Sequence, residues 1–227
     1  MLWMRRTVVT IATTLAALLT LPGIALGTLT EVGLTHAQSQ QVPPVQSTPS
    51  CPGNPCLAVS RTTGYQVKVG PERGLFIAPR DGVIVAWSIT QAKPTKKQIA
   101  YFDANEGGPA SAGIAILRSG PSLTYRLIAQ SPIIPLEPYF GETAQFPLAT
   151  QIPIKKGYVV ALTVPTWAPA LALGFGNDTS WRPSRPKTKC NDTTTQTAQT
   201  TLQVVATYSC LYRKARLTYT ATLISTP

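Results

Sequence analysis

Short runs of apolar residues, many of them alternating with polar ones, follow one another along this 227-residue chain. The clearest runs lie at residues 83–89, 114–117, 123–127, 158–164, 171–175 and 217–223. Runs of this length are typical of β-strands, and 21 prolines and 16 glycines supply turns between them. No long amphipathic helix follows the N-terminal segment to carry a parallel crossover. The pattern predicts an all-β fold, an antiparallel β-sandwich of about eight to ten strands.

The alternation also predicts which side chains face the core. In the run 83–89 the odd-numbered residues, Val85 and Trp87 among them, are expected to point inward. The same holds for the odd-numbered residues of 123–127 and of 217–223. Turn residues 118–122 predict a hairpin between the two neighbouring runs. The run 158–164 is apolar on both faces, which indicates a central strand.

The N-terminal segment has the features of an export signal. Arg5 and Arg6 precede an uncharged run from Thr7 to Gly27, which Pro22-Gly23 interrupts. This pattern is typical of a signal peptide, and small residues predict cleavage after Gly27 or after Ala37. An uncleaved membrane anchor is the alternative, because roughly 20 apolar residues span a bilayer. Five threonines in the run and the Pro-Gly pair favour cleavage.

The predicted organisation is therefore a signal peptide at residues 1–37, a disordered linker at 38–50 and the sandwich at 51–227. The linker contains mostly Gln, Pro and Ser, which bury too little apolar surface to order the chain. The protein is expected to be secreted or held at the cell surface. No membrane span is expected after removal of the signal, and a monomer is the default expectation.

Four cysteines follow the signal, Cys51, Cys56, Cys190 and Cys210. An even number in an exported chain predicts disulfides. Three pairings are possible, and the local one is favoured because the turn-rich sequence CPGNPC brings its own ends together. A zinc site is disfavoured, since the chain has no CxxC spacing and no histidine beyond residue 37.

The charge beyond residue 37 is strongly positive, with 18 Lys and Arg against 8 Asp and Glu. Basic exported proteins tend to meet anionic partners such as wall polymers, acidic polysaccharides or lipid headgroups. Nucleic acid fits the charge but not the compartment, so it is not expected as a partner. The alternative is that the charge only keeps the protein in solution.

Two segments resemble a group of uncharacterised secreted jelly-roll-like proteins from high-GC Gram-positive bacteria. The first is the stretch 76–89, FIAPRDGVIVAWSI, followed by a polar linker and a strand like that at 114–118. The second is PIKKGYVVAL at 153–162. The similarity covers about residues 57 to 224. It implies a jelly-roll-like sandwich and an extracytoplasmic location, and it transfers no catalytic or binding residue.

The residue inventory excludes several kinds of catalysis. The only histidine, His36, lies at a proposed cleavage site, so the predicted sandwich has no Ser-His-Asp triad, Cys-His pair or histidine-bound zinc. A two-carboxylate hydrolase is the least favoured alternative, with Asp103 and Glu106, or Glu137 and Glu142, as local pairs. No cofactor is expected. A structural calcium at 103–106 or 177–179 is less favoured than ordinary Asp/Asn turns.

A non-catalytic binding module for polysaccharide or an anionic wall polymer is therefore the first functional hypothesis. Its densest candidate is the loop at 181–189, where four cations accompany a tryptophan and two prolines. Two further loops each contribute an aromatic residue that could stack on a sugar. The alternatives are that the rings close the core and that the domain is structural or binds other proteins. The candidate ligand-binding residues are Trp181, Arg182, Arg185, Lys187, Lys189, Trp167 and Tyr139.

Overall fold

The computed structural model describes residues 27–33, 49–53, 56–192 and 195–225. The predicted signal peptide and linker therefore lie mostly outside the described residues. Nine of the strands in this part have four or more residues: β1 (Leu29–Val32), β2 (Val59–Val69), β4 (Gly82–Thr90), β5 (Ser111–Ser119), β6 (Thr124–Gln130), β8 (Thr143–Ile154), β9 (Val159–Ala168), β11 (Ser180–Pro183) and β15 (Tyr219–Ser225). Six are shorter: β3 (Glu72–Arg73), β7 (Ile134–Pro135), β10 (Leu171–Leu173), β12 (Val205–Thr207), β13 (Tyr212–Arg213) and β14 (Ala215–Leu217). The helical elements are α1 (Lys96–Asn105), η1 (Pro121–Leu123), η2 (Glu137–Tyr139) and η3 (Lys187–Lys189).

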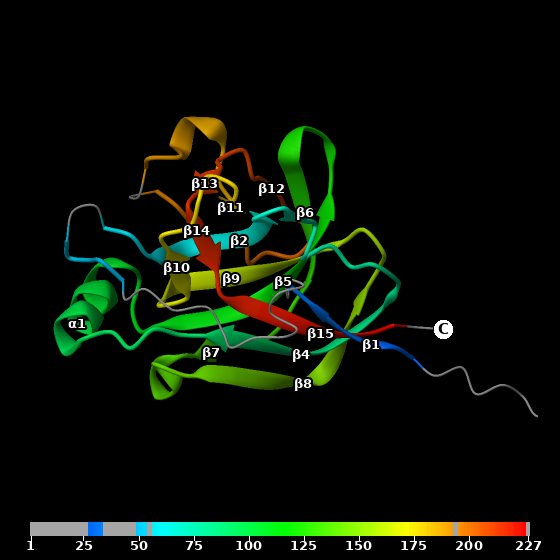
Figure 1. Cartoon of the computed structure of the whole chain (residues 1–227), viewed down its shortest axis with the longest axis horizontal. Coiled ribbons are helices and arrows are strands. Elements are labelled where there is room, and N and C mark those ends of the chain that lie inside the picture. Colours follow the sequence, from blue (N-terminus) through cyan, green and yellow to red (C-terminus); the bar gives the residue numbers. More distant parts are fainter. Residues whose placement is uncertain (1–26, 34–48, 54–55, 193–194, 226–227) are drawn as a thin grey trace, which may run out of the picture.

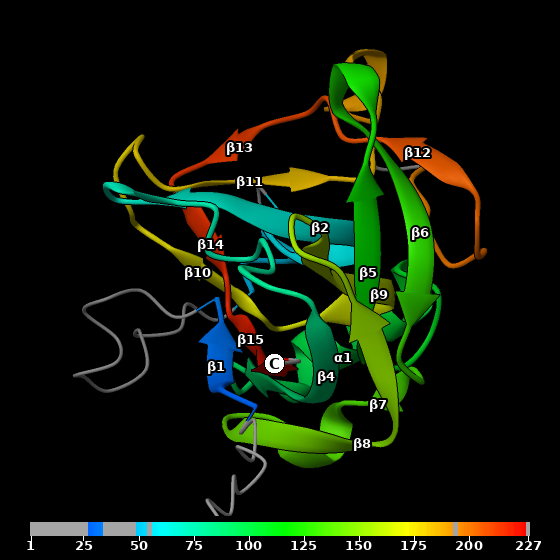
Figure 2. The ribbon, with the colours of Figure 1, turned by 90° about the vertical axis from the view of Figure 1, so that its right-hand side faces the viewer.

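The strands form an antiparallel sandwich, as predicted. A four-stranded sheet has the order β1-β15-β4-β8 (Figure 1). It faces a curled nine-stranded sheet with the path β12-β6-β5-β9-β2-β11-β13, to which β3 and β7 add at the sides. Figure 2 shows the four-stranded sheet below the longer one, with β10 and β14 paired on the left between them. The two sheets bury one shared apolar core, in which Trp87, Trp167 and Phe76 are among the largest side chains.

Several predicted strands are confirmed. The run 114–117 lies in β5 and residues 124–127 of the next run lie in β6, and the two strands pair as an antiparallel hairpin. Residues 159–164 of the predicted central run lie in β9, which has β5 on one side and β2 on the other, so it is a central strand. The odd-numbered residues of 217–223 are all buried, as predicted, but the alternation is incomplete, because Thr218 and Thr222 between them are buried as well.

The predicted inward face of β4 is only half correct, because a β-bulge interrupts the alternation. The pairing of β4 with β8 and with β15 shifts register after Ile84, and Val85 has no partner on either side. One extra residue reverses the side-chain direction on one side of a bulge. Trp87 and Ile89 are buried as predicted, but on the N-terminal side Ile84 is the buried residue and Val83 is half-buried.

Two further expectations need correction. The polar segment after β4 contains the ten-residue helix α1, where Thr95 and Gln98 form a reciprocal capping box. Its apolar face is too narrow to stand out in the sequence, since Phe102 is its only buried residue. Leu123, expected inward, is 38% exposed and has a φ of 60° at the turn of the hairpin. No helix within the described residues is long and apolar enough to cross a membrane.

Candidate functional site

The predicted basic loop leaves β11, passes through η3 and reaches the second disulfide. Cys190 and Cys210 are joined, with their Cα atoms 5.4 Å apart, and Cys51 is joined to Cys56. The local pairing predicted from the sequence is therefore confirmed. Disulfides are typical of oxidising compartments, which fits the expected export of the chain.

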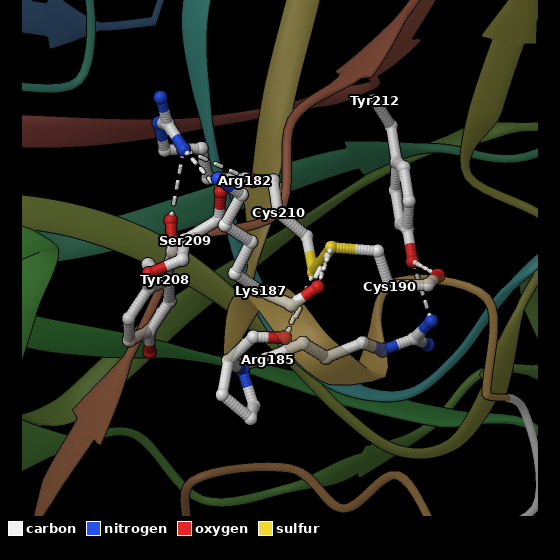
Figure 3. Close-up of a disulfide and its surroundings, with 9 residues drawn as sticks. Arg182, Arg185, Lys187, Cys190, Tyr208, Ser209, Cys210 and Tyr212 are labelled. Atoms are coloured by element: carbon white, nitrogen blue, oxygen red, sulfur yellow. Dashed lines mark hydrogen bonds between the residues drawn. A yellow bond between two sulfur atoms is a disulfide. The ribbon is translucent and has the colours of Figure 1, made fainter.

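Two of the four cations in this loop are used inside the fold (Figure 3). The guanidinium of Arg182 donates hydrogen bonds to the carbonyl oxygens of Tyr208, Ser209 and Cys210, at 3.0 to 3.2 Å. Arg185 is only 8% exposed, and its guanidinium donates to the hydroxyl of Tyr212 at 2.6 Å and lies 5.6 Å from the centre of that ring. Both side chains hold the chain around Cys210 in place.

Burial lowers the pKa of Arg185 from its usual value, and the hydrogen bond and charge of Tyr212 act in the opposite direction. The Tyr212 hydroxyl also donates to the carbonyl oxygen of Cys190, so ring, guanidinium and disulfide form one unit. Buried charges need partners because desolvation is costly. The geometry therefore explains Arg185 as a structural residue of the loop.

The remaining two cations of the loop are exposed. Lys189 forms an ion pair with Asp192 at 2.9 Å between Nζ and Oδ2, three residues along the chain. Lys187 is the one loop cation that is exposed and has no ion pair among the described residues. The structure thus brings the predicted cations together around the disulfide, but it leaves only the two lysines facing solvent.

The expected platform of exposed aromatic rings is not present. Trp181 is 3% exposed and packs against Tyr212, with ring centres 5.0 Å apart. Trp167 is fully buried and stacks on Phe102 at 4.6 Å. Tyr139 is half-buried in η2. The prediction that Trp181 and Trp167 offer a stacking surface is wrong, because both rings close the sandwich.

The carboxylates Asp103 and Glu106 have structural partners. Asp103, in α1, accepts a hydrogen bond from Nε1 of Trp167 at 2.9 Å, and Glu106 pairs with Nε of Arg61 at 3.0 Å. Among the described residues no group of three or more His, Cys, Asp or Glu side chains could hold a metal ion. The contacts of Asp103 and Glu106 therefore explain this pair as structural residues.

A buried polar layer lies beneath the threonine-rich segment that follows Cys190, and sequence reasoning did not identify it. Gln199 is its centre. Its amide nitrogen donates to the carbonyl oxygens of Tyr125 and Val204, its amide oxygen accepts from the Tyr208 hydroxyl, and its backbone N–H donates to Oγ1 of Thr63. The segment 195–201 therefore covers the outer face of the long sheet through hydrogen bonds rather than apolar packing.

Tyr65, Tyr125 and Tyr208 pack together beside this layer, with ring centres 5.0 to 5.7 Å apart. Burial raises the pKa of Tyr65 and of Tyr208 well above the usual tyrosine value, and a hydrogen bond with Tyr125 raises the pKa of Tyr65 further. Both hydroxyls keep their protons at neutral pH. They serve packing and hydrogen bonding rather than proton transfer.

The four-stranded sheet ends in a cluster of cations that the sequence did not reveal. At this end the strands place Thr28, Ser225, Gly82 and Ile154 side by side. The two turns beside Gly82 and Ile154 carry exposed cations, which we call the cationic rim and which consists of Arg80, Lys155 and Lys156. The backbone N–H of Lys156 donates to Oδ1 of Asp81 at 2.7 Å, and this bond joins the two turns.

A pocket of about 220 Å³ opens beside the cationic rim. Its lining combines hydroxyl groups, one guanidinium and two apolar side chains: Thr28, Thr30, Ser225, Arg80, Pro79 and Leu223. None of the three rim cations forms an ion pair within the part of the chain that the structure describes. The turns at 79–82 and 155–157 are visible in the sequence, but only the register Gly82↔Ile154 brings them together.

Fold and site define an all-β sandwich protein with two local disulfides and, at one end of the four-stranded sheet, a pocket lined by one arginine beside a cluster of exposed cations. Comparison of the chain with protein-family models, with curated proteins and with solved structures finds no match in any of the three.

Proposed function

We propose that the protein is a non-catalytic binding module that acts outside the cytoplasm and recognises an anionic polymer of the cell wall through the cationic rim. The observation that carries this proposal is the pocket lined by Arg80, together with the bond from Lys156 to Asp81 that joins the turn of Arg80 to the turn of the exposed Lys155 and Lys156.

The chemistry of the pocket fits a charged, hydroxyl-bearing unit. A guanidinium binds phosphate or carboxylate oxygens through two parallel hydrogen bonds, and lysine adds point charges. The hydroxyls of Thr28, Thr30 and Ser225 line the same space and can exchange hydrogen bonds with a polyol or a sugar. The volume is below the range of about 300 to 1,000 Å³ for drug-sized ligands, so it suits one unit of a polymer.

Burial of Trp181 and Trp167 removes the stacking surfaces on which recognition of a neutral polysaccharide depended. The charge argument is independent of those rings. The proposal therefore names phosphate- or carboxylate-bearing polymers as the ligand class and predicts little affinity for neutral glycans.

The test measures binding of the exported protein to immobilised polyglycerol phosphate, polygalacturonate and neutral dextran at low and moderate salt. A rim variant, R80Q/K155Q/K156Q, is compared with K93Q/K96Q/K97Q, which removes the same charge from exposed lysines before and within α1. Three exposed charge contacts at about 0.5 kcal/mol each predict about a tenfold loss for the rim variant.

The control variant is expected to lose less than threefold, and added salt is expected to weaken binding of the parent protein. Equal losses in the two variants would show that net charge alone, and not the rim, is responsible. Absence of binding to both polyanions, or binding to dextran of equal strength, would also overturn the proposal.

A second candidate function is protein interaction at the outer edge of the long sheet. Four of the seven exposed large apolar residues of the described chain gather beside β12, and we call them the apolar edge patch: Leu123, Leu202, Val204 and Val205. β12 is the terminal strand of its sheet, and Arg126 lies opposite both Val205 and Arg118. Exposed apolar edges mark contact sites, and the two arginines favour a protein partner whose surface is acidic around an apolar centre.

This candidate is tested by placing a photo-reactive amino acid at position 205 in the exporting cell, with position 77 as an equally exposed apolar control. A specific protein adduct at position 205 that the charge reversal Arg118→Glu abolishes is the expected result. Equal labelling at both positions, or an adduct that Arg118→Glu leaves unchanged, would contradict it.

A further inference from the structure

The strand β1 is an integral part of the sandwich, although it lies inside the predicted signal region 1–37. It pairs with β15 in the register Leu29↔Ile224 to Val32↔Ala221. Val32 is 3% exposed, and Glu31 accepts a hydrogen bond from the Thr222 hydroxyl. Without β1, β15 would become an exposed edge of the four-stranded sheet.

Both ends of β1 are also fixed to the domain. On the N-terminal side, the N–H of Thr28 donates to Oγ of Ser225 and the carbonyl oxygen of Thr28 accepts from the N–H of Ser225, both at 3.0 Å. On the C-terminal side, the buried Arg216 donates to the carbonyl oxygen of Gly33 at 3.2 Å. A Cβ at Gly33 would lie 2.5 Å from the Phe76 ring, so glycine allows the chain to pass the core closely.

We infer that export processing cuts the chain between Gly27 and Thr28, and not after Ala37. Water adds across this peptide bond, so that Gly27 gains a carboxylate on the released signal and Thr28 gains the amine of the new N-terminus. A signal peptidase supplies the catalysis and requires small residues, which Ala25 and Gly27 provide. Cleavage after Ala37 would instead remove β1 and two residues that line the pocket, Thr28 and Thr30.

The cut takes place before β1 joins the sheet. In the folded chain Gly27 lies against β15, where a Cβ at this position would be 2.7 Å from the carbonyl oxygen of Ser225. Thr28 and Ser225 are 197 residues apart in sequence. The signal is therefore accessible while the N-terminus emerges, because its later neighbour β15 is among the last segments to be exported.

The new amine would add a further positive charge at the pocket, since the nitrogen of Thr28 lies 3.0 Å from Oγ of Ser225. An α-amine has a pKa of about 7.7 to 8.0 and is largely protonated at neutral pH. This consequence rests on the proposed function, whereas the position of the cut does not.

The full chain is expressed in a bacterial host that exports it, and the product is analysed by N-terminal sequencing and intact mass. The expected product starts at Thr28. A product starting at Gln38, or a retained uncut chain, would overturn the inference. Binding to polyglycerol phosphate is measured separately, so a failure of the proposed function leaves the processing result unaffected.

Two matched substitutions each place an arginine at the third residue before one of the two candidate cuts, at position 25 for the cut after Gly27 and at position 35 for the cut after Ala37. In the Ala25→Arg variant, most of the protein is expected to remain as uncut precursor. In the Thr35→Arg variant, the product is expected to start at Thr28, as in the parent protein. The opposite pattern, with Thr35→Arg blocking the cut, would assign it to Ala37.

Discussion

Removal of the second disulfide is expected to destabilise the domain more than removal of the first. Cys190 and Cys210 are separated by 20 residues and Cys51 and Cys56 by 5. In the chain-entropy description, closing these loops in the unfolded state contributes about 3.3 and about 2.1 kcal/mol at 25 °C. The double variant C190S/C210S is therefore expected to cost about 1 kcal/mol more than C51S/C56S.

The native contacts act in the same direction. Cys210 is 1% exposed, and the carbonyl oxygens at 208–210 accept the three hydrogen bonds from Arg182. Gln199, inside the loop that the second disulfide closes, anchors the polar layer. Loosening this loop therefore weakens interactions within the folded state as well as freeing the unfolded chain.

Thermal unfolding followed by circular dichroism measures both variants against the oxidised parent. For a domain of this size, about 2 to 4 °C of Tm per kcal/mol predicts a loss of about 7 to 13 °C for C190S/C210S and about 4 to 8 °C for C51S/C56S. Urea unfolding, with m-values compared, shows whether the unfolded state has expanded. A larger loss for C51S/C56S, or a loss below about 3 °C for C190S/C210S, would refute this account of the loop.

Three further predictions concern the folded state. Gln199→Ala should cost about 2 to 3 kcal/mol in urea unfolding because it leaves buried polar partners unsatisfied, while Thr200→Ala, which is exposed, should change stability by less than about 0.5 kcal/mol. Because the bulge turns Ile84 rather than Val85 into the core, Ile84→Ala should lower the free energy of unfolding by about 2 to 5 kcal/mol and Val85→Ala by clearly less. Equal losses for the two variants would contradict the bulge. Burial raises the pKa of Tyr219 well above its usual value. The free energy of unfolding should therefore fall as the pH rises above about 10, because the unfolded state then loses the proton that the folded state keeps. A constant free energy of unfolding up to about pH 11 would contradict this.

Part of the candidate site was within reach of the sequence. The spacing of Cys190 and Cys210 predicted their pairing, and the cations near them were visible as a group. The sequence did not reveal which of these cations are bound inside the fold, because the hydrogen bonds from Arg182 to carbonyls 26 to 28 residues away depend on the path of the chain after β11. The two turns of the cationic rim were each visible in the sequence, but their proximity was not, since they lie more than 70 residues apart along the chain.

The sequence by itself determined the all-β class, the β5–β6 hairpin, the central position of β9 and both disulfides. Each of these follows from local alternation, local turns or local spacing, which act within a few residues of chain. Only the tertiary structure decided that Val85 lies in a bulge, that Trp167 and Trp181 close the core and that the turns of Arg80 and Lys155 lie side by side. Those features depend on strand register and on contacts between distant segments, and a one-residue shift in register reverses which side chains are buried.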